Sequence, residues 1–273
     1  KAFVDLVRRE RITHTFLVPP QFSAILSLGN LEKDNFSSLK TILSAGSPLR
    51  LDVKENILTN MSENLFELYG FSEGFATMLK PHDQRKKFGS VGTPVLGFEI
   101  KIIDEKGNEC SPNVAGEIAG YGAGMMKEYY REVELTNSLI WSDNRGRSFI
   151  KSGDIGSLDE DGFLTILDRK KDMIISGGLN VFPVDIEEVV GKHPDIIDVT
   201  VIGVPHEKWG ETCVALIIPK DGVEIDCDEI KNWSNEKLAK HQRLYKVEIR
   251  EEFPRNALGK VLKRVLREPY WSQ

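Results

Sequence analysis

The segment Leu65-Phe66-Glu67-Leu68-Tyr69-Gly70-Phe71-Ser72-Glu73-Gly74 decides the fold class of this chain. It begins with a short, mostly apolar run typical of a buried strand and continues into residues that favour a turn. Toward the N-terminus the patterns alternate: helix over 51–61, strand over 39–43, helix over 22–28, strand over 15–18 and helix over 2–11. Alternating strands and helices predict βαβ units, and therefore an α/β domain with a parallel sheet.

Beyond residue 91 the pattern changes to short alternating runs separated by glycine and proline. Residues 98–103 and 116–119 predict strands of a small antiparallel, β-barrel-like subdomain. Asp159-Glu160-Asp161-Gly162 is a turn signal between two further runs. The glycines of Gly120-Tyr121-Gly122-Ala123-Gly124 lack the spacing of a dinucleotide-binding loop, so we interpret this stretch as a plain loop.

After Asp168 the sequence predicts a separate, small α+β domain of about 100 residues. Its helices are expected from Pro183 onward, over 228–239 and over 260–267, and its strands over 199–204, 212–218 and 247–250. We therefore expect two domains, over residues 1–168 and 169–273, with the boundary at 168–171.

The composition is typical of a globular protein: of 273 residues, 40% are hydrophobic and 29% charged, which excludes collagen, coiled coil and disorder. A net charge of -6 disfavours nucleic-acid binding. The apolar runs are too short for a transmembrane helix, although peripheral membrane contact stays open. Three cysteines without CxxC spacing favour the cytoplasm, and the five histidines lack metal-site spacing. Because the chain starts at Lys1 without a signal peptide, we expect it to begin inside a larger polypeptide.

The sequence Gly70-Phe71-Ser72-Glu73-Gly74 also matches the G-x-S-x-G nucleophile elbow of serine hydrolases. An elbow leads from a strand directly into a helix, yet residues 75–81 have a strand-like composition and soon meet a proline. The sequence therefore disfavours a serine hydrolase, which is kept as an alternative function.

Six short motifs occur in one order along the chain: Ser44-Ala45-Gly46-Ser47-Pro48-Leu49, Tyr69-Gly70-Phe71-Ser72-Glu73, Ser152-Gly153-Asp154, Asp168-Arg169-Lys170-Lys171, Ser176-Gly177-Gly178 with Asn180, and Gly259-Lys260. Each is weak alone, but the ordered set resembles the adenylate-forming acyl-CoA synthetases, the AMP-binding superfamily that also contains firefly luciferase, aryl-acid ligases and nonribosomal adenylation domains. The resemblance extends over essentially the whole chain, which is similar to the C-terminal half of such an enzyme: part of the large domain and all of the small, mobile one.

The resemblance implies a ligase reaction in two steps. A carboxylate attacks the α-phosphate of ATP to give an acyl-adenylate and pyrophosphate, and coenzyme A then displaces AMP to give the thioester. ATP, Mg²⁺ and coenzyme A are the implied co-substrates, and a small-molecule carboxylic acid is the implied partner.

The resemblance also implies an ATP- and AMP-binding set, which comprises Ala45, Gly46, Ser47, Tyr69, Gly70, Asp154 and Arg169. Tyr69 would stack on the base, Asp154 would accept hydrogen bonds from the ribose hydroxyls, and Arg169 would add a charged donor nearby. Glu73 would be the magnesium ligand, and Ser72, where the family more often has threonine, would bind phosphate. By themselves, Tyr69 is equally a core residue and Asp154 a turn residue.

The other implied residues lie in the second predicted domain. Lys260, after Arg255-Asn256-Ala257-Leu258-Gly259, would be the catalytic lysine at the reacting carboxylate. The alternative is a solvent-exposed lysine with no catalytic role. Lys171 would be the hinge about which the domain rotates. Gly177 and Gly178 would face coenzyme A together with Trp209, although a glycine pair also simply makes a turn.

Two observations bear on the scope of the activity. The family's Ser/Thr/Gly-rich phosphate loop is absent from the 273 residues, so we expect the chain alone to be inactive. Phe22, Ala45, Phe71 and Phe75 are expected to form an apolar acyl pocket, which favours a fatty acid; an aryl-acid or 4-coumarate-type ligase is the nearest alternative. A luciferase is disfavoured by Ile175, which stands where luciferases carry a second lysine, and a non-catalytic binding module is the alternative from another class.

Overall fold

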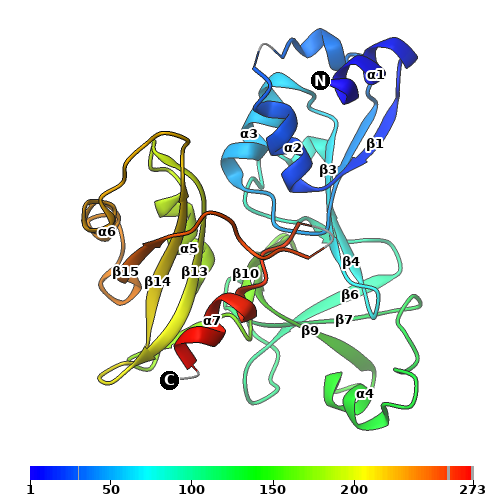
Figure 1. The fold of residues 1–273 in the computed structure, drawn as a ribbon. Helices are drawn as coiled ribbons and strands as arrows, with labels where there is room; N and C mark the ends of the chain where they lie inside the picture. The colour runs from blue at the N-terminus through cyan, green and yellow to red at the C-terminus, as the bar shows by residue number, and fades with distance from the viewer. Residues whose placement is uncertain (30, 257–258, 272–273) are drawn as a thin grey trace. The chain divides into compact units, whose positions relative to one another are not determined.

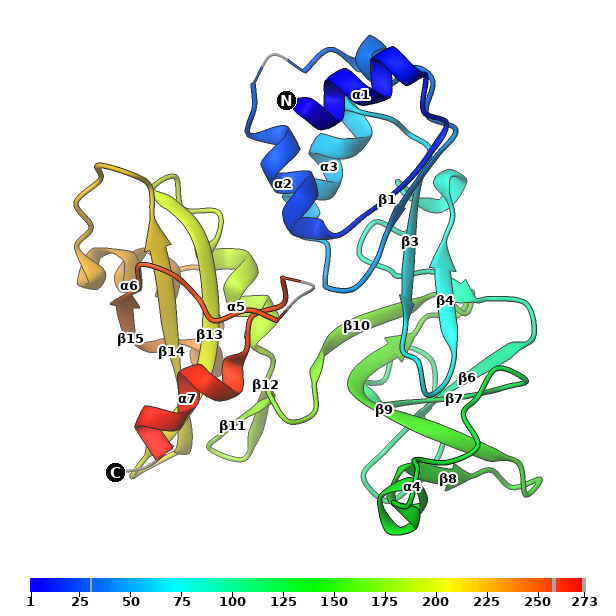
Figure 2. The same cartoon turned by 45° about the vertical axis from the view of Figure 1, so that its right-hand side comes forward.

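The computed structural model describes residues 1–29, 31–256 and 259–271. These residues fall into two compact units, Lys1–Ile166 and Leu167–Gln273, which are described separately (Figures 1 and 2). Among the described residues, no helix is long and apolar enough to cross a bilayer.

The first unit begins with alternating helices and strands. In chain order the elements are α1 (Ala2–Glu10), β1 (His14–Leu17), α2 (Pro19–Leu26), the 3-10 helix η1 (Lys33–Phe36), β2 (Thr41–Ser44), α3 (Leu51–Asn60), β3 (Leu65–Gly70), β4 (Ala76–Leu79), the 3-10 helix η2 (Pro81–Asp83) and β5 (Thr93–Pro94). The predicted βαβ alternation is confirmed. Helix α2 begins at Pro19 rather than at Phe22, because proline lacks only an N–H that the first helical turn leaves unpaired anyway.

The strands β1 to β5 form one sheet in that order. β1 pairs parallel with β2, and β2 with β3, as predicted. β4 pairs antiparallel with β3, because the connection over residues 71–75 is far too short for the crossover that parallel strands need. β5 pairs antiparallel with β4. Helices α1, α2 and α3 gather around β1 to β3 in both views (Figures 1 and 2), and their buried side chains share one core with those strands.

The second part of this unit is an antiparallel sheet, as predicted. Its elements are β6 (Phe98–Ile103), β7 (Gly116–Gly122), α4 (Val133–Leu139), β8 (Ile140–Ser142), β9 (Ser148–Leu158) and β10 (Leu164–Arg169). The strand order is β10-β9-β7-β6, with β8 paired to β9.

The interpretation of residues 120–124 as a plain loop is wrong for its first part, because Gly120 and Gly122 belong to β7. A Cβ atom at Gly120 would lie 1.8 Å from Cδ1 of Phe75, and one at Gly122 would lie 2.3 Å from Cδ1 of Phe98. These glycines are therefore strand positions on which aromatic rings pack, a role that glycine has in strand interiors.

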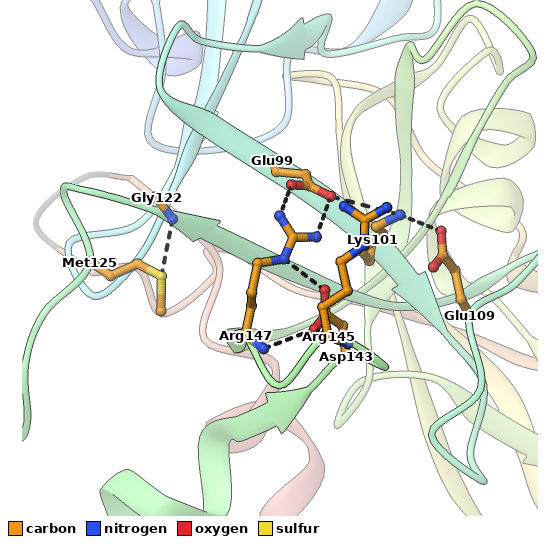
Figure 3. A network of polar contacts seen from close by, with 8 residues as sticks. All are labelled: Glu99, Lys101, Glu109, Gly122, Met125, Asp143, Arg145 and Arg147. Atoms are coloured by element: carbon orange, nitrogen blue, oxygen red, sulfur yellow. Dashed lines mark hydrogen bonds and ion pairs between the residues drawn. The ribbon is translucent and has the colours of Figure 1, made fainter.

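A charged network fixes the edge of this sheet (Figure 3). The Arg147 guanidinium donates to both carboxylate oxygens of Glu99 in β6, at 2.6 and 3.0 Å, and to Asp143 at 2.8 Å. Lys101 in β6 donates to Glu109 at 2.6 Å. The bidentate geometry ties β6 to the turn between β8 and β9.

The second unit is an α+β fold around a third sheet. Its elements are β11 (Ile174–Ser176), β12 (Leu179–Val181), α5 (Pro183–Val190), β13 (Ile196–His206), β14 (Gly210–Pro219), α6 (Cys227–Asn235), the 3-10 helix η3 (Lys240–Gln242), β15 (Leu244–Ile249) and α7 (Lys263–Trp271). The strand order is β12-β11-β14-β13, with β15 parallel to β14. Helix α6 ends before the predicted 239, and α7 begins at Lys263, so Lys260 precedes the helix.

Candidate active site

Five of the predicted nucleotide-binding residues lie at the carboxyl ends of two neighbouring parallel strands. Residues 45–47 follow β2 directly, and Tyr69 and Gly70 end β3. The register pairs Ser44 with Glu67, so both strand ends open at the same edge of the sheet. That edge is where ligands bind in open parallel sheets.

Ser72 and Glu73 lie in the turn that joins β3 to β4. The N–H of Gly74 donates to the Phe71 carbonyl at 3.2 Å, which closes the turn, and β4 then returns antiparallel to β3. A Cβ at Gly70 would lie 2.5 Å from the Phe75 carbonyl oxygen, so the close hairpin requires glycine there. A strand–turn–strand segment is not a nucleophile elbow, which contradicts the hydrolase interpretation.

Asp154 is brought to this edge by a bulge in β9. Ile155 pairs with Glu117 and Lys151 with Ala119, so residues 152–154 stand opposite a single residue of β7. Gly153 has a φ of +73°, and the Asp154 N–H donates to Oγ of Ser152 at 3.0 Å. Bulges re-aim side chains in this way beside functional sites.

The bulge allows Tyr69 and Asp154 to meet across two sheets. The Tyr69 hydroxyl donates to Oδ2 of Asp154 at 2.8 Å, although the two residues are far apart in the chain. The Tyr69 ring packs edge-on against Phe75, with centroids 6.0 Å apart. An aromatic ring and a carboxylate thus lie together beside the ends of β2 and β3.

The acyl pocket expected from Phe22, Ala45, Phe71 and Phe75 does not form from these four side chains. Phe22 is fully buried in the helix-covered core, whereas Phe75 is buried in the core of the antiparallel sheet. Phe71 is partly buried, with its ring 5.2 Å from that of Phe75. Apolar character alone did not reveal that Phe22 and Phe75 face different cores.

The structure adds one residue that the sequence interpretation missed. The Tyr129 hydroxyl donates to Oε1 of Glu73 at 2.7 Å. The hydrogen bond to Glu73, together with partial burial, raises the pKa of Tyr129. The sequence offers no signal that separates Tyr129 from Tyr130, and only burial does so, since Tyr130 is 82% exposed.

Glu73 is the carboxylate of this turn that could bind a magnesium ion. Among the described residues, no three His, Cys, Asp or Glu side chains cluster as a metal site. Magnesium is commonly bound through one or two carboxylates, with nucleotide phosphates and water completing its shell. Glu73, in an open turn beside the strand ends, fits that pattern.

Arg169 and Lys171 lie at the start of the second unit, in and after the end of β10. The Arg169 N–H donates to Oδ1 of Asp168 at 2.6 Å, and the exposed Lys171 accepts a hydrogen bond from Arg267 at its carbonyl, at 3.0 Å. The other Asp168 oxygen accepts from the Val184 N–H at 3.3 Å in the first turn of α5. Burial raises the pKa of Asp168 to about 6.

Gly177, Gly178 and Trp209 occupy one end of the third sheet. Gly177 and Gly178 form the turn between β11 and β12 with φ values of +59° and +80°, so a turn is part of their role. The Gly177 N–H donates to the Trp209 carbonyl at 2.8 Å, and Trp209 is 46% exposed. The structure thus brings these three predicted residues together.

Lys260 is linked to Asn256 by two hydrogen bonds. Its N–H donates to Oδ1 of Asn256 at 2.9 Å, and the Asn256 N–H donates back to its carbonyl at 2.9 Å. Arg255 donates to the Gly259 carbonyl at 2.6 Å and forms an ion pair with Asp198 in β13. Ala257 and Leu258, which belong to the predicted loop motif, lie outside the described residues.

Comparison with known proteins adds an independent line of evidence. The sequence profile of AMP-binding enzymes matches residues 1–130, and that of the AMP-binding enzyme C-terminal domain matches residues 185–260. The chain is 32% identical over 272 residues to indoleacetate–CoA ligase of Aromatoleum aromaticum, covering 98% of this chain and 52% of that protein. It is 35% identical over 248 residues to long-chain-fatty-acid–CoA ligase of Salmonella typhimurium, covering 90% and 43%.

A solved structure agrees with these matches. The crystal structure of ATP-bound MatB from Rhodopseudomonas palustris superimposes with a TM-score of 0.90 at 32% identity, covering 98% of this chain and 52% of that one. The chain spans about half the length of the curated relatives that it matches.

Proposed function

This chain belongs to the AMP-binding, adenylate-forming enzyme family of CoA ligases, and we propose that the whole protein is an acid–thiol ligase. In the first step a carboxylate would attack the α-phosphate of ATP, with pyrophosphate leaving. In the second, the thiol of coenzyme A would attack the acyl-adenylate, with AMP leaving. The observation that carries the proposal is the Tyr69–Asp154 hydrogen bond beside the ends of β2 and β3.

Residues 45–47 and Gly70 would line the nucleotide, and the Tyr69 ring would stack on its base. Asp154 would accept hydrogen bonds from the ribose hydroxyls, either in place of the bond from Tyr69 or beside it, because a carboxylate accepts several hydrogen bonds at once. Ser72, exposed in the β3–β4 turn, would donate to phosphate. A magnesium ion held by Glu73 would neutralise phosphate charge during the first step.

The second unit would supply the remaining groups. Lys260 would stabilise the negative charge at the reacting carboxylate and α-phosphate, and Arg169 would add a donor near the ribose. Rotation about Lys171 would exchange Lys260 for the Gly177-Gly178 turn and Trp209, which would contact coenzyme A. Support comes from the geometry within the unit: Gly177 and Trp209 are hydrogen-bonded neighbours, and Lys260 is hydrogen-bonded to Asn256 and precedes α7.

We propose a hydrophobic acid as the substrate, either a fatty acid or an aryl acid. The matched relatives include a long-chain-fatty-acid ligase and an indoleacetate ligase at similar identities, so similarity does not choose between them. Phe71, in the site turn and only partly buried, is an apolar side chain available to such an acid. A cytoplasmic location stays a prediction.

The decisive experiment is acid-dependent exchange of labelled pyrophosphate into ATP by the whole protein, with fatty and aryl acids supplied in parallel. We expect exchange with one class, and a drop by a factor of about 100 to 1,000 on Lys260→Ala, the scale for removing one positioned transition-state donor. Acid-independent ester hydrolysis that is lost on Ser72→Ala would contradict the ligase proposal. AMP binding without exchange would indicate a non-catalytic binding module.

The two half-reactions separate the roles of the second unit. Lys260→Ala should slow acyl-adenylate formation and leave thioester formation from supplied acyl-adenylate largely intact, whereas Lys171→Pro, which fixes one torsion, should do the opposite. Single-turnover assays of each half-reaction measure both. Equal slowing of both steps by both variants would contradict alternating use of the site.

The 273 residues alone are expected to turn over poorly, because the phosphate-loop motif is absent from their sequence. Near-normal turnover by these residues would contradict that expectation.

A further inference from the structure

We propose that Tyr129 is a positioning residue that holds one oxygen of the Glu73 carboxylate so that the other oxygen faces the magnesium–nucleotide complex. The inference rests on the proposed function, since it gives a partner to the proposed magnesium ligand. It concerns only residues of the first unit.

The first argument is the double attachment of Glu73 to the segment 123–132, which we call the tyrosine loop. The Tyr129 hydroxyl donates to Oε1 of Glu73 at 2.7 Å, and the Met126 N–H donates to the Glu73 carbonyl at 2.8 Å. One attachment fixes the backbone of the turn and the other fixes the side chain. The orientation of the carboxylate is therefore set by the tyrosine loop as well as by the β3–β4 hairpin.

The second argument is that the tyrosine loop is itself anchored at both ends. At the end of β7, the Gly122 N–H approaches Sδ of Met125 at 3.2 Å (Figure 3). Toward α4, the Tyr129 N–H donates to Oγ1 of Thr136 at 3.0 Å, and that buried hydroxyl donates to the Glu132 carbonyl at 2.9 Å. These hydrogen bonds hold the backbone of the tyrosine loop in place, and with it the Tyr129 phenol.

The third argument is chemical. The Tyr129 hydroxyl satisfies one carboxylate oxygen of Glu73, and a hard cation requires only the second. A phenol is a neutral hydrogen-bond donor at neutral pH, so it supports the carboxylate without adding charge beside the cation. Carboxylates that ligate metals are generally hydrogen-bonded by a supporting residue, and loss of such a partner typically costs a factor of about 10 to 100 in metal affinity or activity.

The neighbouring tyrosine provides a matched control. Tyr130 is 82% exposed, and its ring lies 5.0 Å from the guanidinium carbon of Arg131. Tyr129→Phe and Tyr130→Phe each remove one hydroxyl from adjacent residues of the same loop. Only the first removes a hydrogen bond to Glu73.

The test uses the whole protein and two readouts. In pyrophosphate exchange, the Mg²⁺ concentration for half-maximal rate should rise about tenfold or more in Tyr129→Phe and stay unchanged in Tyr130→Phe, while the KM of the acid is unaffected. Independently of activity, Mn²⁺ added to the ATP complex and followed by electron paramagnetic resonance should bind correspondingly more weakly to Tyr129→Phe. Wild-type Mn²⁺ binding by Tyr129→Phe would overturn the proposal.

A double-mutant cycle with Glu73→Asp tests whether Tyr129 acts through the Glu73 carboxylate. Glu73→Asp shortens the side chain and withdraws the carboxylate from Tyr129, so it should weaken Mn²⁺ binding by itself. Adding Tyr129→Phe to Glu73→Asp should then cause no further weakening. Additive losses would mean that Tyr129 acts elsewhere, whereas a wild-type protein without acid-dependent exchange would overturn the proposed function itself.

Discussion

Breaking the buried ion pair between Lys54 and Glu67 should destabilise the helix-covered sheet more than any surface charge does. Nζ of Lys54 in α3 lies 2.7 Å from Oε1 of Glu67 in β3, and the two side chains are 1% and 10% exposed. Lys54 also donates to the Phe88 carbonyl at 2.5 Å. Burial is the main cause that lowers the pKa of Lys54 and raises that of Glu67, with the partner's charge opposing both shifts.

The expected size follows from this geometry. At 2.7 Å and an effective dielectric of about 20, the attraction is about 6 kcal/mol, and much of it is offset by desolvation of both charges. Lys54→Met leaves Glu67 buried without its partner, so we expect a loss of about 3–5 kcal/mol in the free energy of unfolding. The loss should shrink on acidification, because the raised pKa of Glu67 allows protonation to remove the unpaired charge.

Hydrogen exchange measured by mass spectrometry on peptides from β2 and β3 is the suitable assay, because the chain has two units and need not unfold in one step. Arg85→Met is the matched control: Arg85 pairs with Glu55 of the same helix at 3.4 Å, and both side chains are about half exposed, so the cost should stay below about 1 kcal/mol. Lys54→Met/Glu67→Leu should recover most of the stability. A loss below 1 kcal/mol for Lys54→Met, or no recovery in the double variant, would refute the reasoning.

Three further predictions concern single sites. Burial raises the pKa of Asp168 to about 6, so its contribution to stability is fully present below an ordinary aspartate pKa and is lost as the pH rises through about 6. Asp168→Asn should abolish this pH-dependent change of about 3 kcal/mol in the free energy of unfolding. The measurement is the pH dependence of hydrogen exchange in the second unit. Gly120→Ala places a methyl 1.8 Å from Cδ1 of Phe75 and should lower stability by about 1–3 kcal/mol, with partial rescue by Phe75→Leu in thermal unfolding. Burial opposes ionisation of Glu248, but hydrogen bonds from Lys246, Tyr270 and Arg250 lower its pKa to about 2. Tyr270→Phe removes one of these bonds to a charged carboxylate and should lower the free energy of unfolding by about 1–2 kcal/mol at neutral pH. An unchanged urea midpoint would contradict this.

Local sequence was sufficient for the element types and for the family. Apolar spacing predicted the βαβ alternation and the antiparallel sheet, because helix and strand periodicity are properties of neighbouring residues. The six ordered motifs indicated the AMP-binding family for the same reason, since each is a short contiguous segment. Where local signals were wrong, as at Gly120, the cause was long-range pairing: Gly120 pairs with Ile100 of β6 and Ile150 of β9, and the Phe75 ring packs on it.

Tertiary structure alone decided which side chains meet. Asp154 reaches Tyr69 because a two-sheet arrangement and a bulge in β9 turn it there, and no local pattern encodes the register of β7 against β9. Tyr129 and Tyr130 are equivalent in sequence, yet only Tyr129 contacts Glu73. Side-chain partners depend on long-range pairing of strands and loops, whereas the tendency to form a helix or strand depends on residues a few positions apart.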